Sequence, residues 1–378
     1  MATEYLTNDI ELTSVADAIR EKGGTSDPLT YPDGFASAVR AIQTGIVPQL
    51  VVTVSAGATV TATNGSKTIS GTSDSTGVCT LIVPETGTWS VSATLGGQTS
   101  DTKTVSITDS YAVSLYFVSS TLNDNEWSVI KSVSDAGQGA NYWSIGDRKE
   151  VILDGTVGHL ALSNYTTYAF IIGFNHNQEL EGTNRIHFQL AKTALSGGTD
   201  VCFCDSYYTS PVSTTGYFSM NSSATNSGGW ENSQMRTNIC GTSLSNYSGT
   251  MIAVIPDALR AVLKSVTKYT DNTGNNSTSA SAVTATKDYF FLLSEFEVFG
   301  SISRANSNEA SKQAQYAYYS AGNSKVKHKH NGTSAAARWW LRSPLASNSD
   351  GFENVKTDGT VEDRTARASF GFAPGFCV

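Results

Sequence analysis

The sequence predicts a multidomain chain, with a short helical module first, an all-β sandwich second and a larger α+β domain last. Residues 1–45 carry apolar side chains at helical spacing. Residues 46–118 alternate between apolar and polar side chains in runs that recur about every ten residues. Residues 124–378 mix strand patterns, a few helices and long polar loops. A chain of 378 residues is long enough for two or three domains.

Composition disfavours several classes of function. Charged residues make up only 15% of the chain, and Ser, Thr, Asn and Gly take their place. A net charge of -8 disfavours a nucleic-acid partner, because phosphate binding needs clustered Lys and Arg. No apolar run approaches about 18 residues, so membrane insertion is not expected. No signal peptide is expected, because the residues after Met1 are polar, and synthesis in a reducing cytoplasm is expected with it.

Two short helices are expected in residues 1–45. The first ends at the Gly-Gly pair at 23–24, and the second follows the turn Y-P-D-G at 31–34. Helices shorter than about 12–15 residues are marginal alone, so this module needs a partner. That partner is a second copy of the chain, another protein or the next domain. The two apolar stripes consist of Leu12, Val15, Ile19, Phe35, Val39 and Ile42.

An antiparallel β-sandwich is expected in residues 46–118. Gly-rich turns separate its alternating runs, and no cluster of titratable side chains interrupts them, which favours a spacer. Trp89 and Leu95 should point inward, and Cys79 should be a small core residue. The predicted strands are 51–55, 59–63, 79–83, 89–95, 104–107 and 111–117.

The large domain should follow a polar linker at 119–127. Its apolar stretch at 290–300 is expected to be central, and the polar stretch at 270–282 to be a loop. Few helices, many short strands and long loops are typical of an α+β domain. The predicted strands are 143–147, 149–155, 168–175 and 185–190, and the predicted helices are 231–239 and one that starts at Pro256.

Two aromatic blocks bracket a polar segment in the tail from Arg338 to Val378. W-W-L opens it at 339–341. Phe370, Phe372 and Phe376 are separated by two and four residues, which indicates one face of a strand. A terminus that ends in F-C-V indicates a strand tied into a core. We therefore expect two anchored ends that hold an exposed and adaptable polar segment between them.

Several motifs carry a resemblance to a known family. W-W-L-R-S-P, followed by a polar segment and A-P-G-F-C, resembles C-terminal domains of bacteriophage tail and gut-bacterial prophage proteins. Some members are targets of diversity-generating retroelements, and the family is similar to the C-type-lectin fold. Further matches, in the same order, are Y-W-S-I-G-D at 142–147, F-I-I-G-F-N-H at 170–176, G-G-W-E-N-S-Q-M-R at 228–236 and F-L-L-S-E-F-E-V-F-G at 291–300.

The resemblance covers residues 124–378 and implies a C-type-lectin-like domain in which 142–147 lies near 370–378. Residues 1–45 resemble an N-terminal module of phage minor structural proteins. Residues 46–118 resemble the immunoglobulin-like or carboxypeptidase-regulatory-like spacers of phage tail proteins. Together these similarities imply a phage tail protein that is made in the bacterial cytoplasm and carried in the virion.

The family likeness also implies partners and a site. Residues 1–45 would bind other virion tail proteins, and the chain would form a homo-oligomer such as a trimer. The last domain would bind a host cell-surface protein or glycan. The implied framework residues are Trp339, Trp340 and Arg342. The implied variable surface consists of Ala346, Asn348, Asp350, Glu353, Asn354, Lys356, Glu362, Asp363, Arg364, Thr365 and Arg367.

No catalytic residue, cofactor or metal ligand is predicted. Cys202 and Cys204 form a C-x-C rather than the C-x2-C pairs of structural zinc, so they and Cys240 are expected to be buried thiols. The basic segment H-K-H at 328–330 is expected to be a solvated loop. The motifs E-P-N, Q-P-D and W-N-D of calcium-dependent sugar binding do not occur.

Glu295 and Glu297 form a carboxylate pair of the kind that hydrolyses glycosides. No sugar-cleft signature accompanies them, so a structural role with Arg342 as a buried ion-pair partner is expected. Three hypotheses follow for the chain. It is a receptor-binding protein, a carbohydrate-active enzyme or sulfatase-activating-type oxidase on the same fold, or a structural tail subunit with residues 345–367 buried between copies.

Overall fold

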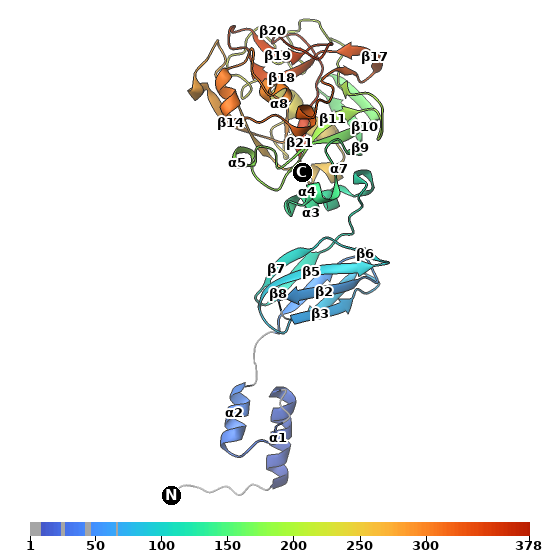
Figure 1. Ribbon diagram of the computed structural model, residues 1–378, viewed down its shortest axis with the longest axis vertical. Helices are drawn as coiled ribbons and strands as arrows, with labels where there is room; N and C mark the ends of the chain where they lie inside the picture. The colour runs from blue at the N-terminus through green and yellow to red at the C-terminus, as the bar shows by residue number, and fades with distance from the viewer. Residues whose placement is uncertain (1–8, 24–26, 42–46, 66) are drawn as a thin grey trace. The chain divides into compact units, whose positions relative to one another are not determined.

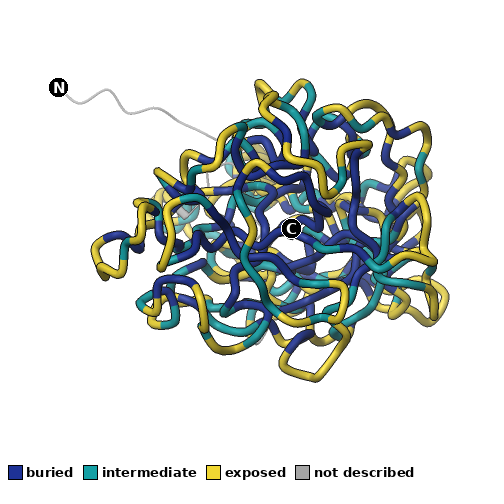
Figure 2. Tube along the Cα trace, turned by 90° about the horizontal axis from the view of Figure 1, so that it is seen from above, coloured by how far each residue is buried: buried dark blue, intermediate teal, exposed yellow. Residues whose placement is uncertain are grey.

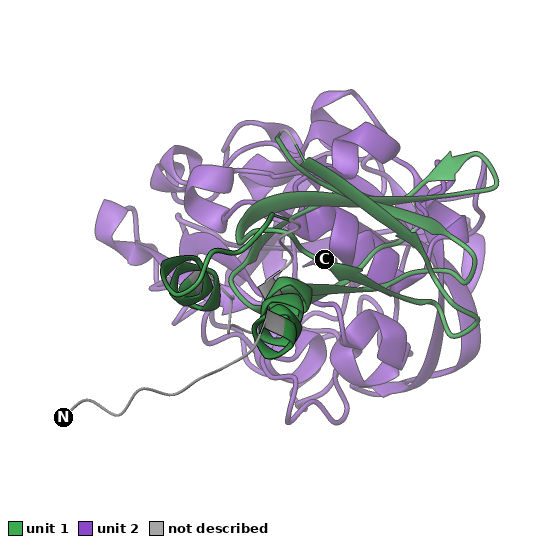
Figure 3. Ribbon diagram, turned by 90° about the horizontal axis from the view of Figure 1, so that it is seen from below, with its two compact units in different colours: residues 1–116 green, residues 117–378 purple. Residues whose placement is uncertain are grey.

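The computed structural model describes residues 9–23, 27–41, 47–65 and 67–378. The chain forms two compact units, Met1–Tyr116 and Phe117–Val378, which Figure 3 colours separately. Each unit has its own buried side chains, and β-strands dominate both. The expected multidomain and mostly β architecture is confirmed at this level.

Two helices, α1 (Asp9–Gly23) and α2 (Asp33–Ala41), form where the apolar spacing predicts them. Ile19 of α1 is buried. Val15 and Val39 remain 50% and 52% exposed, so the helices cover only part of their apolar stripes. Two predicted positions, Gly24 and Ile42, lie outside the described residues.

The remaining described part of unit 1 consists of two small β-sheets (Figure 1). One sheet has the order β4-β1-β8, and the other has β3-β2-β5-β6 with β7 also paired to β5. Strands β3 and β6 were not predicted. The bounds are β1 (Gln49–Thr53), β2 (Thr59–Asn64), β3 (Lys67–Thr72), β4 (Val78–Ile82), β5 (Gly87–Leu95), β6 (Gln98–Thr99), β7 (Lys103–Ile107) and β8 (Ser110–Ser114).

The two sheets pack closely through small side chains. A Cβ at Gly71 of β3 would lie 2.8 Å from Leu81 and 3.0 Å from Cys79, both on β4 of the other sheet. Cys79 and Trp89 are buried, as predicted. Two expectations are wrong. Leu95 is 38% exposed because it borders the turn to β6, and β1 pairs with β8 in parallel rather than antiparallel.

Unit 2 contains a five-stranded antiparallel sheet with the order β15-β21-β11-β10-β9. Its strands β9, β10 and β11 confirm three strand predictions. The last strand, β21, inserts between β11 and β15, so that Phe376 lies opposite Phe188 on one side and Phe290 on the other. The bounds are β9 (Arg148–Val157), β10 (Leu160–Phe174), β11 (Ile186–Lys192), β15 (Phe290–Phe291) and β21 (Gly375–Cys377).

The C-terminal end is tied into this sheet, as its apolar sequence predicts. Val378 is fully buried and exchanges two backbone hydrogen bonds of 3.0 and 3.1 Å with Ile186. The expected proximity of 142–147 to 370–378 is not found as a strand pair. Residues 143–147 form no strand, and Gly146 donates instead to a carbonyl of β10.

Short helices and three small sheets complete unit 2. The sheets are β12-β16-β17, β13-β14 and β18-β19-β20. Their first five strands are β12 (Val201–Cys202), β13 (Val266–Asp271), β14 (Val283–Asp288), β16 (Lys327–Lys329) and β17 (Gly332–Ala337). The helical elements are η1 (Leu122–Asp124), α3 (Trp127–Asp135), α4 (Gly139–Tyr142), α5 (Gln178–Glu181), η2 (Met235–Cys240), α6 (Met251–Val254), α7 (Asp257–Arg260), η3 (Ala280–Ala282), α8 (Glu295–Phe299), η4 (Ser307–Ser311) and α9 (Ala317–Ser320).

Three predicted elements differ from the structure. The helix expected at 231–239 is the short π-helix η2. The helix expected from Pro256 is the single turn α7, and Val266 belongs to β13. Phe370, Phe372 and Phe376 were expected on one strand, but only Phe376 lies in β21. Segments this short take their conformation from tertiary packing, which overrides local propensity.

Residues 119–127, which were expected to be a linker, pack onto unit 2. The indole of Trp143 donates to the carbonyl of Ser119 at 3.0 Å, and the backbone of Glu150 donates to the side chain of Asn123 at 2.8 Å. Buried residues run through the interior of the unit (Figure 2). Among the described helices, none has the length and apolar character that a membrane crossing needs.

Candidate ligand-binding surface

The polar part of the tail folds as a three-stranded antiparallel sheet. Its strands are β18 (Trp339–Pro344), β19 (Gly351–Val355) and β20 (Val361–Thr365). A loose segment over 345–367 was expected, and the two strands β19 and β20 correct that expectation. Every residue of β18 and β19 is buried, whereas β20 at the edge is partly exposed. Exposure in this sheet is therefore confined to the edge strand β20.

Trp339 and Trp340 anchor β18, as expected of framework residues. Both are fully buried. Trp339 Nε1 donates to the carbonyl of Lys325 at 2.9 Å, and Trp340 Nε1 donates to that of Phe218 at 3.0 Å. The ring of Trp340 also packs on Phe370 with centroids 4.8 Å apart. Because each buried indole N–H has an acceptor, both rings are fixed in orientation.

The eleven predicted surface positions divide into three groups by burial. The exposed positions are Asn348, Arg364 and Arg367. The half-buried positions are Ala346, Asp350, Lys356, Glu362, Asp363 and Thr365. The buried positions are Glu353 and Asn354.

Glu353 and Asn354 correct the prediction, because β19 lies between two other strands. Asn354 Nδ2 donates to the carbonyl of Glu362 at 2.9 Å. Both carboxyl oxygens of Glu353 are buried without a hydrogen-bond partner among the described residues. Burial, followed by the nearby charges of Glu295 and Asp363, raises the pKa of Glu353 to about 10. Its carboxyl group is therefore a neutral acid at pH 7.

Ion pairs fix the charged side chains of β20. Arg304 pairs with Asp363, and Arg338 pairs with Glu362. Glu362 also lies 3.0 Å from Arg364 Nη2. Such partly exposed pairs contribute little to stability, but they hold the charges in a fixed pattern along the edge strand.

The loop between β18 and β19 is held by a residue from a distant segment. Asn226 is fully buried, and its Nδ2 donates to the carbonyls of Leu345, Asn348 and Gly351 at 3.1, 2.8 and 3.0 Å. Its Oδ1 accepts from the backbone of Asn275 at 2.8 Å. The loop backbone is thus fixed while the side chain of Asn348 stays exposed.

A hollow of about 640 Å³ lies beside this loop and the edge strand. Its volume falls within the range of about 300–1,000 Å³ that small-ligand sites occupy. Ala346 is the predicted surface residue that lines it, and Arg304 brings a charge to its wall. The full lining is Thr278, Ser303, Arg304, Ala305, Leu345, Ala346, Ser347 and Val361.

Arg342 of β18 joins a buried ionic cluster, which confirms the expected ion pair with a glutamate. Its Nη2 lies 2.9 Å from Glu297 Oε1, and both side chains are fully buried. Lys268 Nζ lies 2.9 Å from the same oxygen and 2.7 Å from Glu181 Oε2. It also donates to the hydroxyl of Tyr316 at 2.8 Å. Two cations and two carboxylates thereby meet in the interior.

Burial and charge act in opposite directions within this cluster. Burial raises the pKa of Glu181 to about 7, although Lys268 opposes the shift. Burial would also raise the pKa of Glu297, but the charges of Arg342 and Lys268 outweigh it and lower that pKa. Burial lowers the pKa of His176 to about 3, so this imidazole is neutral at pH 7. The cluster is close to electrically balanced.

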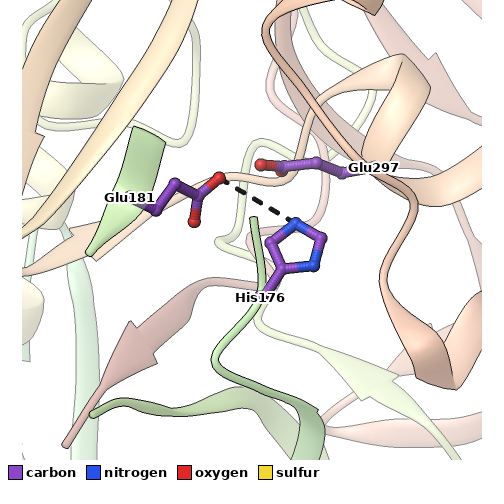
Figure 4. Close-up of side chains that lie close together, drawn as sticks. All are labelled: His176, Glu181 and Glu297. Carbon is purple, nitrogen blue, oxygen red and sulfur yellow. Dashed lines mark ion pairs between the residues drawn. The ribbon is translucent and has the colours of Figure 1, made fainter. Parts of the chain in front are cut away.

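His176, Glu181 and Glu297 also have the geometry of a metal-ligand group. Their ligand atoms lie within 4.8 Å of one another (Figure 4). Lys268 already bonds to both carboxylates, so its ammonium supplies the positive charge that an ion would bring. The ring of His176 stacks on Tyr316 with centroids 3.7 Å apart. These contacts favour a structural ion cluster over a metal centre.

The pair Glu295 and Glu297 is buried on α8 and forms no open carboxylate site. Ser294 Oγ accepts from the backbone of Glu297, and the Glu297 carboxylate accepts from the backbone of Ser294 in return. The carboxylate of Glu295 accepts from the three backbone N–H groups of residues 303–305. Glycoside hydrolysis needs carboxyl groups that face a substrate cleft, so the geometry favours a structural role.

Cys202 and Cys204 are buried free thiols, as predicted, with sulfur atoms 3.9 Å apart. In the described residues, no cysteine belongs to a group of three metal-type ligands. The solvated loop expected at 328–330 is wrong. His328 lies within strand β16, which pairs with β12 and β17, and His330 is buried beside Cys204.

Sequence analysis missed Lys268 and Glu181, which complete the ionic cluster. Their contact joins residues 87 positions apart, so no local pattern contains it. One sequence signal was available, because in a strand Lys268 lies on the same face as the apolar residue Val266. The aromatic cluster of His159, Tyr207 and Tyr217 was also not predicted.

A comparison with protein families matches residues 211–378 to a model described as a domain of unknown function, DUF6273. The matched region contains β13–β21, and it excludes β9, β10 and β11, which complete the five-stranded sheet. A search of curated proteins finds no match to this chain. The family description states no activity.

Proposed function

We propose that this protein is the receptor-binding protein of a bacteriophage tail and that it binds its ligand through the β19–β20 edge. In this proposal, residues 1–45 attach to other virion tail proteins or to a second copy of the chain. Residues 46–118 act as an immunoglobulin-like spacer. Residues 124–378 form a C-type-lectin-like domain that binds a host cell-surface protein or glycan.

The observation that carries the proposal is the contrast between the buried strands β18 and β19 and the partly exposed edge strand β20. The first two strands are buried, and the ion pair of Arg342 with Glu297 fixes the first to α8. The third strand and the loop at 346–350 are exposed or half-buried beside a hollow of about 640 Å³. A ligand site of this kind combines a rigid base with open side chains.

Substitution at the exposed positions leaves this base intact. Arg364 is exposed, and its guanidinium lies 3.0 Å from Glu362 Oε1 and donates to the carbonyl of Asp363 at 3.2 Å. Asn348 accepts a hydrogen bond from the backbone of Asp350 at 2.9 Å, whereas Asn226 holds the loop backbone independently. Variation by a retroelement at such positions would change ligand contacts without changing the fold. A neighbouring reverse-transcriptase gene with a near-copy of the coding region for 338–378 would support that part of the proposal.

Competition for host cells tests the function. Purified full-length protein should slow adsorption of the phage that carries it, because free protein occupies the same receptor. The variant Arg364→Glu reverses one exposed charge and should compete less well at the same concentration. Glu231→Gln serves as the control, because Glu231 is exposed and its backbone bonds to Asn272 and Arg236, outside β20. Wild-type protein that leaves adsorption unchanged would contradict the proposal.

A further inference from the structure

Three aromatic side chains form an exposed row on unit 2. The rings of His159 and Tyr217 are stacked, with centroids 4.3 Å apart and planes 18° from parallel. Tyr207 meets Tyr217 edge-on at 4.1 Å. Tyr207 is 41% exposed, His159 is exposed and Tyr217 is half-buried. The mutual contacts order the rings, so they present aromatic surface to solvent at a low cost in conformational entropy.

One buried carboxylate holds the chain segments that carry the tyrosines. Asp205 Oδ1 accepts from the backbone of Tyr207 at 2.9 Å and from the hydroxyl of Ser369 at 2.7 Å. Asp205 Oδ2 accepts from the backbone of Phe218 at 2.8 Å, and Phe218 directly follows Tyr217. Hydrogen bonds to a charged acceptor are strong and directional. The row is therefore built into the fold rather than carried on a free loop.

The position of His159 depends on a glycine. A Cβ at Gly216 would lie 3.2 Å from two atoms of the His159 ring. Gly216 also has φ of +96°, a conformation that side-chain-bearing residues rarely adopt. A side chain at position 216 would therefore displace the imidazole, which stacks on the ring of Tyr217.

The row adjoins the surface proposed for ligand binding. The carbonyl of Arg367 accepts from the backbone of Val212 at 2.8 Å and from the hydroxyl of Ser219 at 3.3 Å. Val212 lies between Tyr207 and Phe218 in the sequence, and Ser219 directly follows Phe218. The backbone that exposes Arg367 is therefore bonded to the segment that exposes the aromatic rings.

We infer that Tyr207, Tyr217 and His159 bind a pyranose ring of a glycan. A pyranose presents a face of slightly positive C–H groups, which suits the negative face of an aromatic ring. Its hydroxyl edge needs hydrogen-bond donors and acceptors, and hydroxyl side chains provide both. Exposed hydroxyl residues occupy the segment between the two tyrosines, at Thr209, Ser210, Ser213, Thr214 and Thr215.

Two other partners fit this surface less well. A nucleic-acid strand would bring phosphates to a chain with a net charge of -8. A lipid surface would cover the flanking hydroxyls without offering them partners, which costs free energy. A glycan can stack its C–H face on the rings and form hydrogen bonds with the hydroxyl side chains. The inference rests on the proposed function and narrows its ligand to a saccharide.

The test measures binding of three defined probes, maltohexaose, cellohexaose and chitohexaose, to the full-length protein. Saturation-transfer NMR should show contact to the ring protons of at least one probe, and calorimetry should give its affinity. Tyr207→Ala and Tyr217→Ala should each weaken binding about tenfold, because each removes one stacking face. Tyr207→Phe keeps the ring and should bind nearly as the wild type does.

A matched control is Tyr111→Ala in β8, since Tyr111 is also 41% exposed but lies in the other unit. It should leave binding unchanged, and the melting temperature of each variant checks its fold. The inference is overturned if no probe binds, or if binding survives in both Tyr207→Ala and Tyr217→Ala. Competition for phage adsorption by wild-type protein that binds no probe would overturn the glycan assignment and leave the proposed function standing.

Discussion

Arg342 and Glu297 pair in the interior with no solvent exposure of either side chain, although 45 positions separate them in the sequence. Lys268 shares the same carboxylate. The pair connects β18 to α8, and the two tryptophans at 339–340 pack the same strand into the core. The exposed edge of the sheet is thus built on a strand that has little freedom to move.

Removing one member of this pair should destabilise unit 2 strongly. Arg342→Met leaves a buried carboxylate partly uncompensated, which costs about 3–5 kcal/mol in comparable buried pairs. Arg364→Met at the exposed edge should cost less than about 1 kcal/mol. The double variant Arg342→Met with Glu297→Met should recover part of the loss, because no unpaired charge remains. Urea unfolding measures all three, and equal losses for Arg342→Met and Arg364→Met would contradict this account.

Glu353 should make stability depend on pH. Its folded pKa of about 10 lies above the ordinary glutamate pKa of 4.5, so the folded state retains a proton that the unfolded state releases. The contribution of Glu353 to the free energy of unfolding is therefore fully present below pH 4.5 and is lost as the pH rises toward 10. Glu353→Gln cannot ionise and should lack this loss, so the variant gains relative to wild type by up to about 1.4 kcal/mol per pH unit.

The pH test compares urea unfolding at pH 5 and pH 8 for both proteins. Glu231→Gln is the matched control, because Glu231 is exposed, and it should follow the wild-type curve. Curves for wild type and Glu353→Gln that stay parallel across this range would show that Glu353 ionises normally in the folded protein.

Asn354 and Asn348 should respond differently to the same change. Asn354→Ala removes a buried donor to the carbonyl of Glu362 and should cost about 1–3 kcal/mol. Asn348→Ala removes an exposed side chain and should stay within about 0.5 kcal/mol of wild type. Thermal unfolding of the two variants distinguishes the buried position from the exposed one. A similar small effect at both would restore the original prediction that both belong to the variable surface.

The exposed valines of the N-terminal helices should mediate association. Val15 and Val39 are each about half exposed, so Val15→Glu with Val39→Glu should leave the helices formed while placing charge on their apolar stripes. Light scattering should then show loss of self-association, or virions should contain less of the variant. Normal assembly and normal incorporation of the double variant would exclude this surface as an attachment site. Unit 2 should keep its melting temperature, because neither substitution lies in it.

The regular parts of the fold were predictable because their signal is local. Strands β9, β10 and β11 follow from apolar and alternating runs, and the buried terminus follows from F-C-V. The segment at 351–355 failed for a physical reason. Glu353 and Asn354 indicate a polar loop, but the neighbouring strands β18 and β20 bury the whole segment.

The buried framework residues of the candidate site were predictable, whereas their long-range contacts were not. Both tryptophans and Arg342 are where their apolar and charged sequence context places them. The partners of Arg342 and the role of Asn226 depend on contacts between distant segments, and hydrophobic periodicity carries no information on such contacts. The aromatic row likewise forms only when 159, 207 and 217 meet in the fold.

Simultaneous substitution of the exposed positions tests the central claim most directly. A protein with Asn348→Ser, Arg364→Ser and Arg367→Ser should melt within about 2 °C of wild type, because none of these side chains is buried. Its competition for host adsorption should change clearly. A collapse in folding, with adsorption intact in the fraction that still folds, would contradict the claim that a rigid interior carries an adaptable binding surface.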